Sequence, residues 1–189
     1  MKKVLLGLFL LILCTAGFSW TALEDYSNVE YVYYKTTGFD DGDEGIDEII
    51  YGVKIELTNQ GYKITNETIY DMPPDAVLDS SILFGQSATL SMYAMFDLTT
   101  LMVLSAVDFE EMVTTNLFMV GGKIKYEGQM TIEGRLKKYT GIKVVYYDEE
   151  NQIVKYWVLN ENIPFPLLNV TMEDGEETIR TKLWDYKMR

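Results

Sequence analysis

The sequence predicts a mainly β domain of the α+β class. We expect a strongly curved, half-barrel-like antiparallel sheet that wraps one to three short helices from the middle of the chain. Two observations support this prediction. Residues 123–189 consist of strand-like segments separated by short polar breaks, and in most of them apolar residues alternate with polar ones. That period of two is typical of strands with one buried face. Only the region after Pro73 lacks an obvious strand pattern.

The chain begins with the pattern of a secretory signal peptide. Lys2 and Lys3 precede an unbroken apolar run over residues 4–13, and small residues follow. This run is too short to span a bilayer, so we expect cleavage after Gly17 or Ser19 rather than a retained anchor. We therefore expect a periplasmic or secreted protein with no integral membrane segment after cleavage.

The signal peptide would occupy residues 1–19, and residues 20–189 would form a single β-rich extracytoplasmic domain. Bacterial lipoproteins are acylated on a cysteine at the end of such an apolar run, where Cys14 stands. Leu13 precedes Cys14, whereas the processing enzyme needs a small residue there. We interpret Cys14 as an apolar residue of the discarded peptide.

Composition narrows the chemistry of the mature chain. The full chain has 16 basic residues, 29 acidic residues, one cysteine and no histidine. Loss of Lys2 and Lys3 leaves 14 basic residues against 29 acidic ones, a net charge of −15. Without cysteine or histidine there is no disulfide, no thiol nucleophile and no imidazole base or ligand. We expect no cofactor and no metal site, and the charge argues against nucleic acid as a partner.

Three stretches near the start of the mature chain favour strands and turns. Residues 29–35 are rich in tyrosine and valine, which favour strands. The acidic segment 40–48 alternates carboxylates with glycines, which fits either a calcium site or a solvated connection, and its order does not match an EF-hand loop. A β-hairpin should follow, in which a turn at residues 59–61 separates two alternating sets: Tyr51, Val53, Ile55 and Leu57 before it, and Tyr62 and Ile64 after it.

The middle of the chain has helix-like signals. Pro73 and Pro74 precede a short segment, residues 76–84, that favours a helix. Residues 90–104 fit either a strand or a helix. Asp108 has Glu111 three residues later, in the manner of a capping box. We therefore expect one or more short helices lying against the sheet.

Methionine and phenylalanine gather in this middle region, and their adaptable side chains suit an apolar ligand. The alternative is that they form the core between the helices and the sheet. The candidate ligand-lining residues are Met92, Met95, Phe96, Met102, Phe109, Met112, Phe118 and Trp157.

The last third favours a meander of strands. Ile124, Tyr126, Met130 and Ile132 alternate with polar residues, which predicts one buried face. Residues 153–159 are apolar on both faces, which predicts a central strand. Asp174-Gly175 predicts a tight hairpin turn before a final strand, residues 178–186. In that strand we expect Arg180, Lys182, Trp184 and Tyr186 to share one face.

The strand Lys155-Tyr156-Trp157-Val158, the loop from Ile163 to Leu167 and the closing Trp184-Asp185-Tyr186-Lys187 resemble the secreted half-barrel proteins related to the lipoprotein carriers LolA and LolB. The order of hairpins, helical middle and meander is similar as well. The resemblance implies a curved sheet whose concave apolar face holds acyl chains. It implies no catalytic residues.

Three functions from different classes follow. The first is a non-catalytic binder or carrier of an apolar ligand, such as a lipid, an acyl chain or a lipidated protein, in the concave face of the sheet. The alternative is an interaction or sensor domain of the cell envelope with a filled core. The third is a hydrolase with paired carboxylates among Asp108, Glu110 and Glu111, although acidic residues at a helix start usually complement its dipole. We expect a protein that is not an enzyme.

Overall fold

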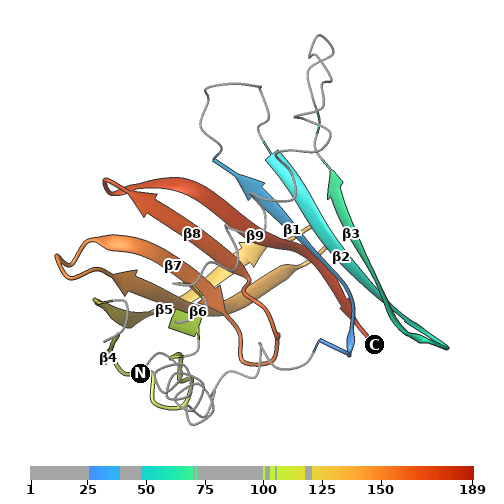
Figure 1. The fold of residues 1–189 in the computed structure, drawn as a ribbon. Coiled ribbons are helices and arrows are strands. Elements are labelled where there is room, and N and C mark those ends of the chain that lie inside the picture. The colour runs from blue at the N-terminus through green and yellow to red at the C-terminus, as the bar shows by residue number, and fades with distance from the viewer. Residues whose placement is uncertain are drawn as a thin grey trace, which may run out of the picture.

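The computed structural model describes residues 26–38, 48–69, 71, 100, 103–104, 106–117 and 121–189. They form one open antiparallel sheet of nine strands in the order β3-β2-β1-β9-β8-β7-β6-β5-β4 (Figure 1). The strands are β1 (Val29–Thr37), β2 (Glu48–Thr58), β3 (Gly61–Ile69), β4 (Thr115–Asn116), β5 (Lys123–Glu133), β6 (Lys138–Tyr147), β7 (Ile153–Leu159), β8 (Leu168–Glu173) and β9 (Glu176–Met188).

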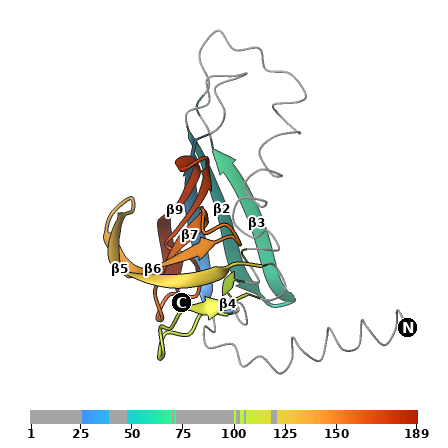
Figure 2. The same cartoon turned by 90° about the vertical axis from the view of Figure 1, so that its left-hand side faces the viewer.

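Consecutive strands are neighbours in the sheet, except that β3 and β4 lie at its two opposite edges, and β1 pairs with β9 and so joins the two ends of the described chain. The sheet is strongly curved, and Figure 2 shows β5 and β6 running across the direction of β2 and β3. The turn between β5 and β6 reaches β9 although β7 and β8 lie between β6 and β9 in the sheet order. There the backbone N–H of Arg135 donates to the carbonyl of Trp184 at 2.6 Å.

The predicted α+β class is wrong, because the helices that we expected are not found among the described residues. Strands account for 65% of the described residues and helical residues for only 2%, and no helix element lies among them. The carboxylate of Asp108 does accept from the backbone N–H groups of Glu110 and Glu111, at 2.8 and 3.2 Å, as a cap would. Only one turn follows, because Met112 has a left-handed backbone with φ of 48° and β4 begins three residues later. The expected helix over residues 76–84 and most of residues 90–104 lie outside the described residues.

Two hydrophobic cores form within the described chain. Core 1 is built on Tyr34, Tyr139, Val145, Tyr156, Val158, Phe165, Leu168, Val170 and Leu183, with others. Core 2 is built from Val103, Leu104 and Val107 together with Ile124, Val144, Tyr146, Trp157 and Leu159. Along β7 the side chains alternate between the two cores, so this strand is buried on both faces, and the prediction of a central strand is confirmed.

The alternation along β5 does not keep its apolar residues on one face. Tyr126 pairs with Val144, whereas Gln129 pairs with Ile142, so β5 holds one more residue than β6 between these pairs. Gly128 lies in this bulge with φ of 61°. An extra residue reverses the faces that follow it. As a result, Ile124 and Tyr126 serve core 2, whereas Ile132 and Met130 serve core 1.

Both predicted hairpins are present. Asp174 and Gly175 have φ of 51° and 84°, as a tight turn requires, and they join β8 to β9. We predicted that Arg180, Lys182, Trp184 and Tyr186 share one face of the last strand, and this prediction is wrong for Tyr186. A register shift between β1 and β9 at this point leaves Lys182 beside the ring of Trp184, whereas Tyr186 packs against Phe165 and Tyr139 of core 1.

Candidate functional site: an apolar face of the β2–β3 hairpin

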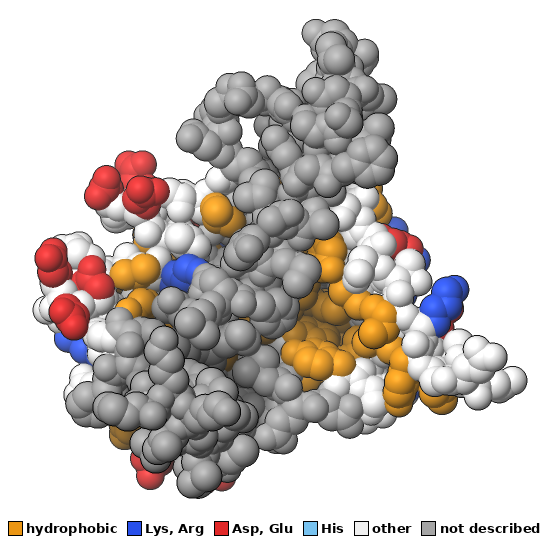
Figure 3. Space-filling model, viewed as in Figure 1, with side chains coloured by type: hydrophobic (Ala, Val, Ile, Leu, Met, Phe, Trp, Pro, Cys, Tyr) orange, Lys and Arg blue, Asp and Glu red, His pale blue; other side chains and the backbone are white. Residues whose placement is uncertain are grey.

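The described chain exposes a group of large apolar side chains on one face of the β2–β3 hairpin. Ile55 lies opposite Ile64, and Leu57 lies opposite Tyr62, so all four share a face. The exposed fraction is 66% for Leu57, 63% for Ile64 and 55% for Tyr62. We call these four residues the apolar hairpin face. Figure 3 shows apolar side chains gathered on the viewer's side of the molecule, to the right of centre, where β1 to β3 lie.

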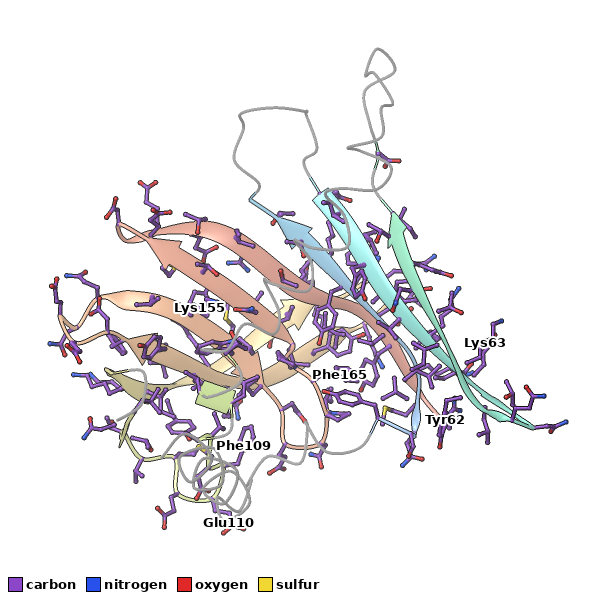
Figure 4. All side chains as sticks on the ribbon, viewed as in Figure 1. Tyr62, Lys63, Phe109, Glu110, Lys155 and Phe165 are labelled. Carbon is purple, nitrogen blue, oxygen red and sulfur yellow. The ribbon has the colours of Figure 1, made fainter. Side chains whose placement is uncertain are left out.

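This face is continuous with core 1. Ile55 packs against the core, as does Val32 of the neighbouring strand β1. Tyr186 pairs with Val32 across β1 and β9 and contacts Phe165 at 5.2 Å between ring centroids. Figure 4 places Phe165 between the centre of the sheet and the hairpin end that carries Tyr62. The apolar surface therefore extends from a filled core onto an exposed hairpin.

The opposite face of the hairpin is polar and its charges are paired. The ammonium of Lys54 lies 2.6 Å from the Glu67 carboxylate, and that of Lys63 lies 3.1 Å from Glu56. The hydroxyl of Tyr33 also donates to Glu67, at 2.6 Å. The hydrogen bond from Lys54, followed by that from Tyr33, lowers the pKa of Glu67. The hairpin is thus amphipathic, with water-facing charges on one side and exposed apolar residues on the other.

The alternation in this hairpin is predictable from the sequence, but its exposure is not. Alternating apolar residues in a strand are usually buried against a core. Here the strands extend beyond the part of core 1 that covers them, since burial declines along β2 towards Leu57. Periodicity carries no signal of what covers a face, so this surface was not among the candidates.

The predicted ligand-lining residues fall into two groups. Met92, Met95, Phe96, Met102 and Phe118 lie outside the described residues. Trp157 is fully buried in core 2, Phe109 packs against the same core, and Met112 is 45% exposed. The structure therefore brings Phe109 and Trp157 together, in a packed cluster. Figure 4 shows Phe109 and Glu110 far to the left of Tyr62 and Lys63.

The carboxylates considered for catalysis do not converge in the described chain. Asp108 uses its carboxylate to hold the backbone of its own turn, and Glu110 and Glu111 are exposed. Of the acidic segment 40–48 only Glu48 is described, and it forms an ion pair with Lys35. A search restricted to the described residues found no group of three or more acidic, cysteine or histidine side chains placed to hold a metal ion.

Comparison with known proteins found no family model that matches this sequence and no matching curated protein. The resemblance to the LolA and LolB carriers therefore stays a prediction. Within the described residues, no helix has the length and apolar character needed to cross a lipid bilayer.

Proposed function

We propose that the protein is a non-catalytic extracytoplasmic binder of an apolar ligand, such as a lipid or an acyl chain. The observation that supports the proposal most directly is the apolar hairpin face, where Leu57, Tyr62 and Ile64 are each more than half exposed. Exposed contiguous apolar surface rimmed by polar residues commonly marks a binding site. The alternation of charged pairs on the opposite face shows that the hairpin has a distinct apolar side.

The binding surface proposed here is the apolar hairpin face together with the adjoining edge of core 1. A flexible acyl chain could lie along cross-strand pairs such as Ile55 with Ile64 and Leu57 with Tyr62. Each methylene that leaves water would contribute about 0.8 kcal/mol. The described part of the Met/Phe group adds less support, because Trp157 is already covered by Val103 and Leu104 in core 2.

The test is binding of a long-chain fluorescent fatty acid to the purified protein, with Leu57→Gln as the variant. Loss of one apolar contact should weaken binding about tenfold. Leu136→Gln is the matched control, because Leu136 is an even more exposed leucine, at 82%, on the turn between β5 and β6. Its affinity should equal that of the unchanged protein.

Saturable binding that Leu57→Gln weakens and Leu136→Gln does not would support the proposal. No binding by the unchanged protein, or equal loss in both variants, would overturn it. In that case the filled cores favour the interaction-domain alternative.

A further inference from the structure

The two edges of the described sheet differ in how well they are protected against pairing. The edge strand β4 is only two residues long. The other edge, β3, has nine residues and no proline, and its pairing with β2 runs without a register shift from Gly61 to Ile69. A long, regular edge presents a row of unpaired N–H and C=O groups, which is a template for another strand.

We propose that β3 pairs with β3 of a second copy of this chain, in antiparallel orientation about a two-fold axis at Thr65. In this register Lys63 lies opposite Glu67 of the second copy, and Glu67 lies opposite Lys63 of the second copy. The charge pattern of β3 is therefore complementary to itself. Moving the axis to Ile64 would place Lys63 opposite a threonine and Glu67 opposite a glycine, and moving it to Asn66 would place Lys63 opposite Ile69.

The ion pairs already present within the hairpin extend this complementarity. Lys54 pairs with Glu67, and Lys63 pairs with Glu56, all on the charged face of the hairpin. Joining two copies at Thr65 would give the series Lys54, Glu67, Lys63 of the second copy and Glu56 of the second copy. The signs alternate along this series, and the two-fold axis repeats it. Opposite charges directly across an antiparallel pair are favourable, and like charges are unfavourable.

The overall negative charge of the chain does not prevent this contact. Strands β2 and β3 carry Lys54 and Lys63 against Glu48, Glu56 and Glu67, a local charge of −1. Glu48 is itself paired with Lys35 of β1. At physiological salt the screening length is about 8 Å, so acidic groups elsewhere on the surface are largely screened.

Pairing also reduces exposure on the apolar side. Antiparallel pairing about a two-fold axis keeps equivalent faces on the same side of the joined sheet. In the proposed register Ile64 lies opposite Asn66 and Tyr62 opposite Thr68 of the second copy, so the neighbouring strand would partly cover these two side chains, which are exposed now. This contact needs no bound ligand, so its test does not rest on the proposed function, although Tyr62 and Ile64 belong to both surfaces.

The test is analytical ultracentrifugation of the unchanged protein and of two charge-reversal variants, Lys63→Glu and Glu67→Lys. The unchanged protein should form a concentration-dependent dimer. Each variant alone should have a dimer dissociation constant at least about tenfold higher, because like charges face each other at both positions. An equimolar mixture of the two should recover the dimer, since every reversed charge then faces its opposite.

Lys138→Glu is the matched control, because Lys138 pairs with Glu133 across β5 and β6 with similar exposure of both side chains. Its dimer should be as stable as that of the unchanged protein. Recovery in the mixture, with no effect of the control, would establish the β3 contact. A monomer at all concentrations, failure of the mixture to recover, or equal weakening by Lys138→Glu would overturn it.

Discussion

At the scale of single residues, Trp157 shows how one side chain can fit two interpretations. Its sequence context made it a candidate ligand-lining residue. In the structure it is fully buried, and it packs in core 2 with Val103, Leu104 and Val107. Its indole Nε1 has no hydrogen-bond partner among the described residues. Trp157 packs between β7 and the segment that contains Val103, Leu104 and Val107, so it stabilises the folded state by keeping water away from both.

Replacing Trp157 with alanine should therefore lower the free energy of unfolding by about 3–5 kcal/mol, as expected for truncating a buried aromatic residue. Urea unfolding followed by circular dichroism measures this change. Leu136→Ala, at an exposed turn, should change it by less than about 0.5 kcal/mol. If the free energy of unfolding fell by less than about 1 kcal/mol in Trp157→Ala, the indole would lie beside an open space rather than in a packed core.

At the scale of elements, β5 shows how one strand serves two cores. Its apolar residues Ile124, Tyr126, Met130 and Ile132 are all separated by even numbers of positions, yet Tyr126 contributes to core 2 and Ile132 to core 1. The bulge at Gly128 makes this exchange, because one extra residue reverses the faces beyond it. The bulge is also where the strand can bend, so it contributes to the curvature that brings the β5–β6 turn to β9.

Two changes at Gly128 should have different effects on stability. Gly128→Ala should cost about 1–2 kcal/mol, since φ is 61° there and no atom lies within 4 Å of an added Cβ. Deleting Gly128 should cost more, because Met130 and Ile132 would be turned away from core 1. Chemical unfolding of both variants compares these costs. If both variants lose the same stability, β5 re-forms its pairing with β6 after the deletion, and the bulge does not determine which core each side chain faces.

At the scale of the whole molecule, the sheet joins segments that are far apart in sequence. Pairing of β1 with β9 connects the hairpins of the first part to the meander of the last part. Core 1 spans this junction, with Tyr34 from β1, Tyr139 from β6 and Tyr156 from β7. The hydroxyl of Tyr34 donates to the carbonyl of Pro166 at 2.9 Å, which ties β1 to the connection before β8. These tyrosines couple the stability of the entire sheet to alkaline pH.

Burial raises the pKa of Tyr139 and of Tyr156 from 10.0 to about 12, with a further contribution to Tyr139 from Asp185 and to Tyr156 from its hydrogen bond to Glu177. Burial also raises the pKa of Tyr34 well above 10.0. Because these pKa values are higher in the folded state, the protonated phenols stabilise it. This stabilisation is complete below pH 10 and should be lost as pH rises from about 10 to about 12.

Ultraviolet titration of the folded protein should therefore separate exposed tyrosines from a buried group that ionises near pH 12 together with loss of circular dichroism. In Tyr156→Phe the stability should fall less steeply with pH in this range, because one of the linked groups is gone. Ionisation of all tyrosines near pH 10 with the fold intact would contradict the burial of this group.

The sequence by itself determined the local elements: the alternating strands, the two-faced burial of β7 and the turn at Asp174 and Gly175, since each depends on neighbours along the chain. Only the tertiary structure decided what covers each face. It put β1 beside β9, split β5 between two cores, stopped the turn at Asp108 before a helix formed and left Leu57, Tyr62 and Ile64 exposed. The physical reason is that a period of two shows which side chains share a face, whereas burial depends on contacts between residues distant in sequence.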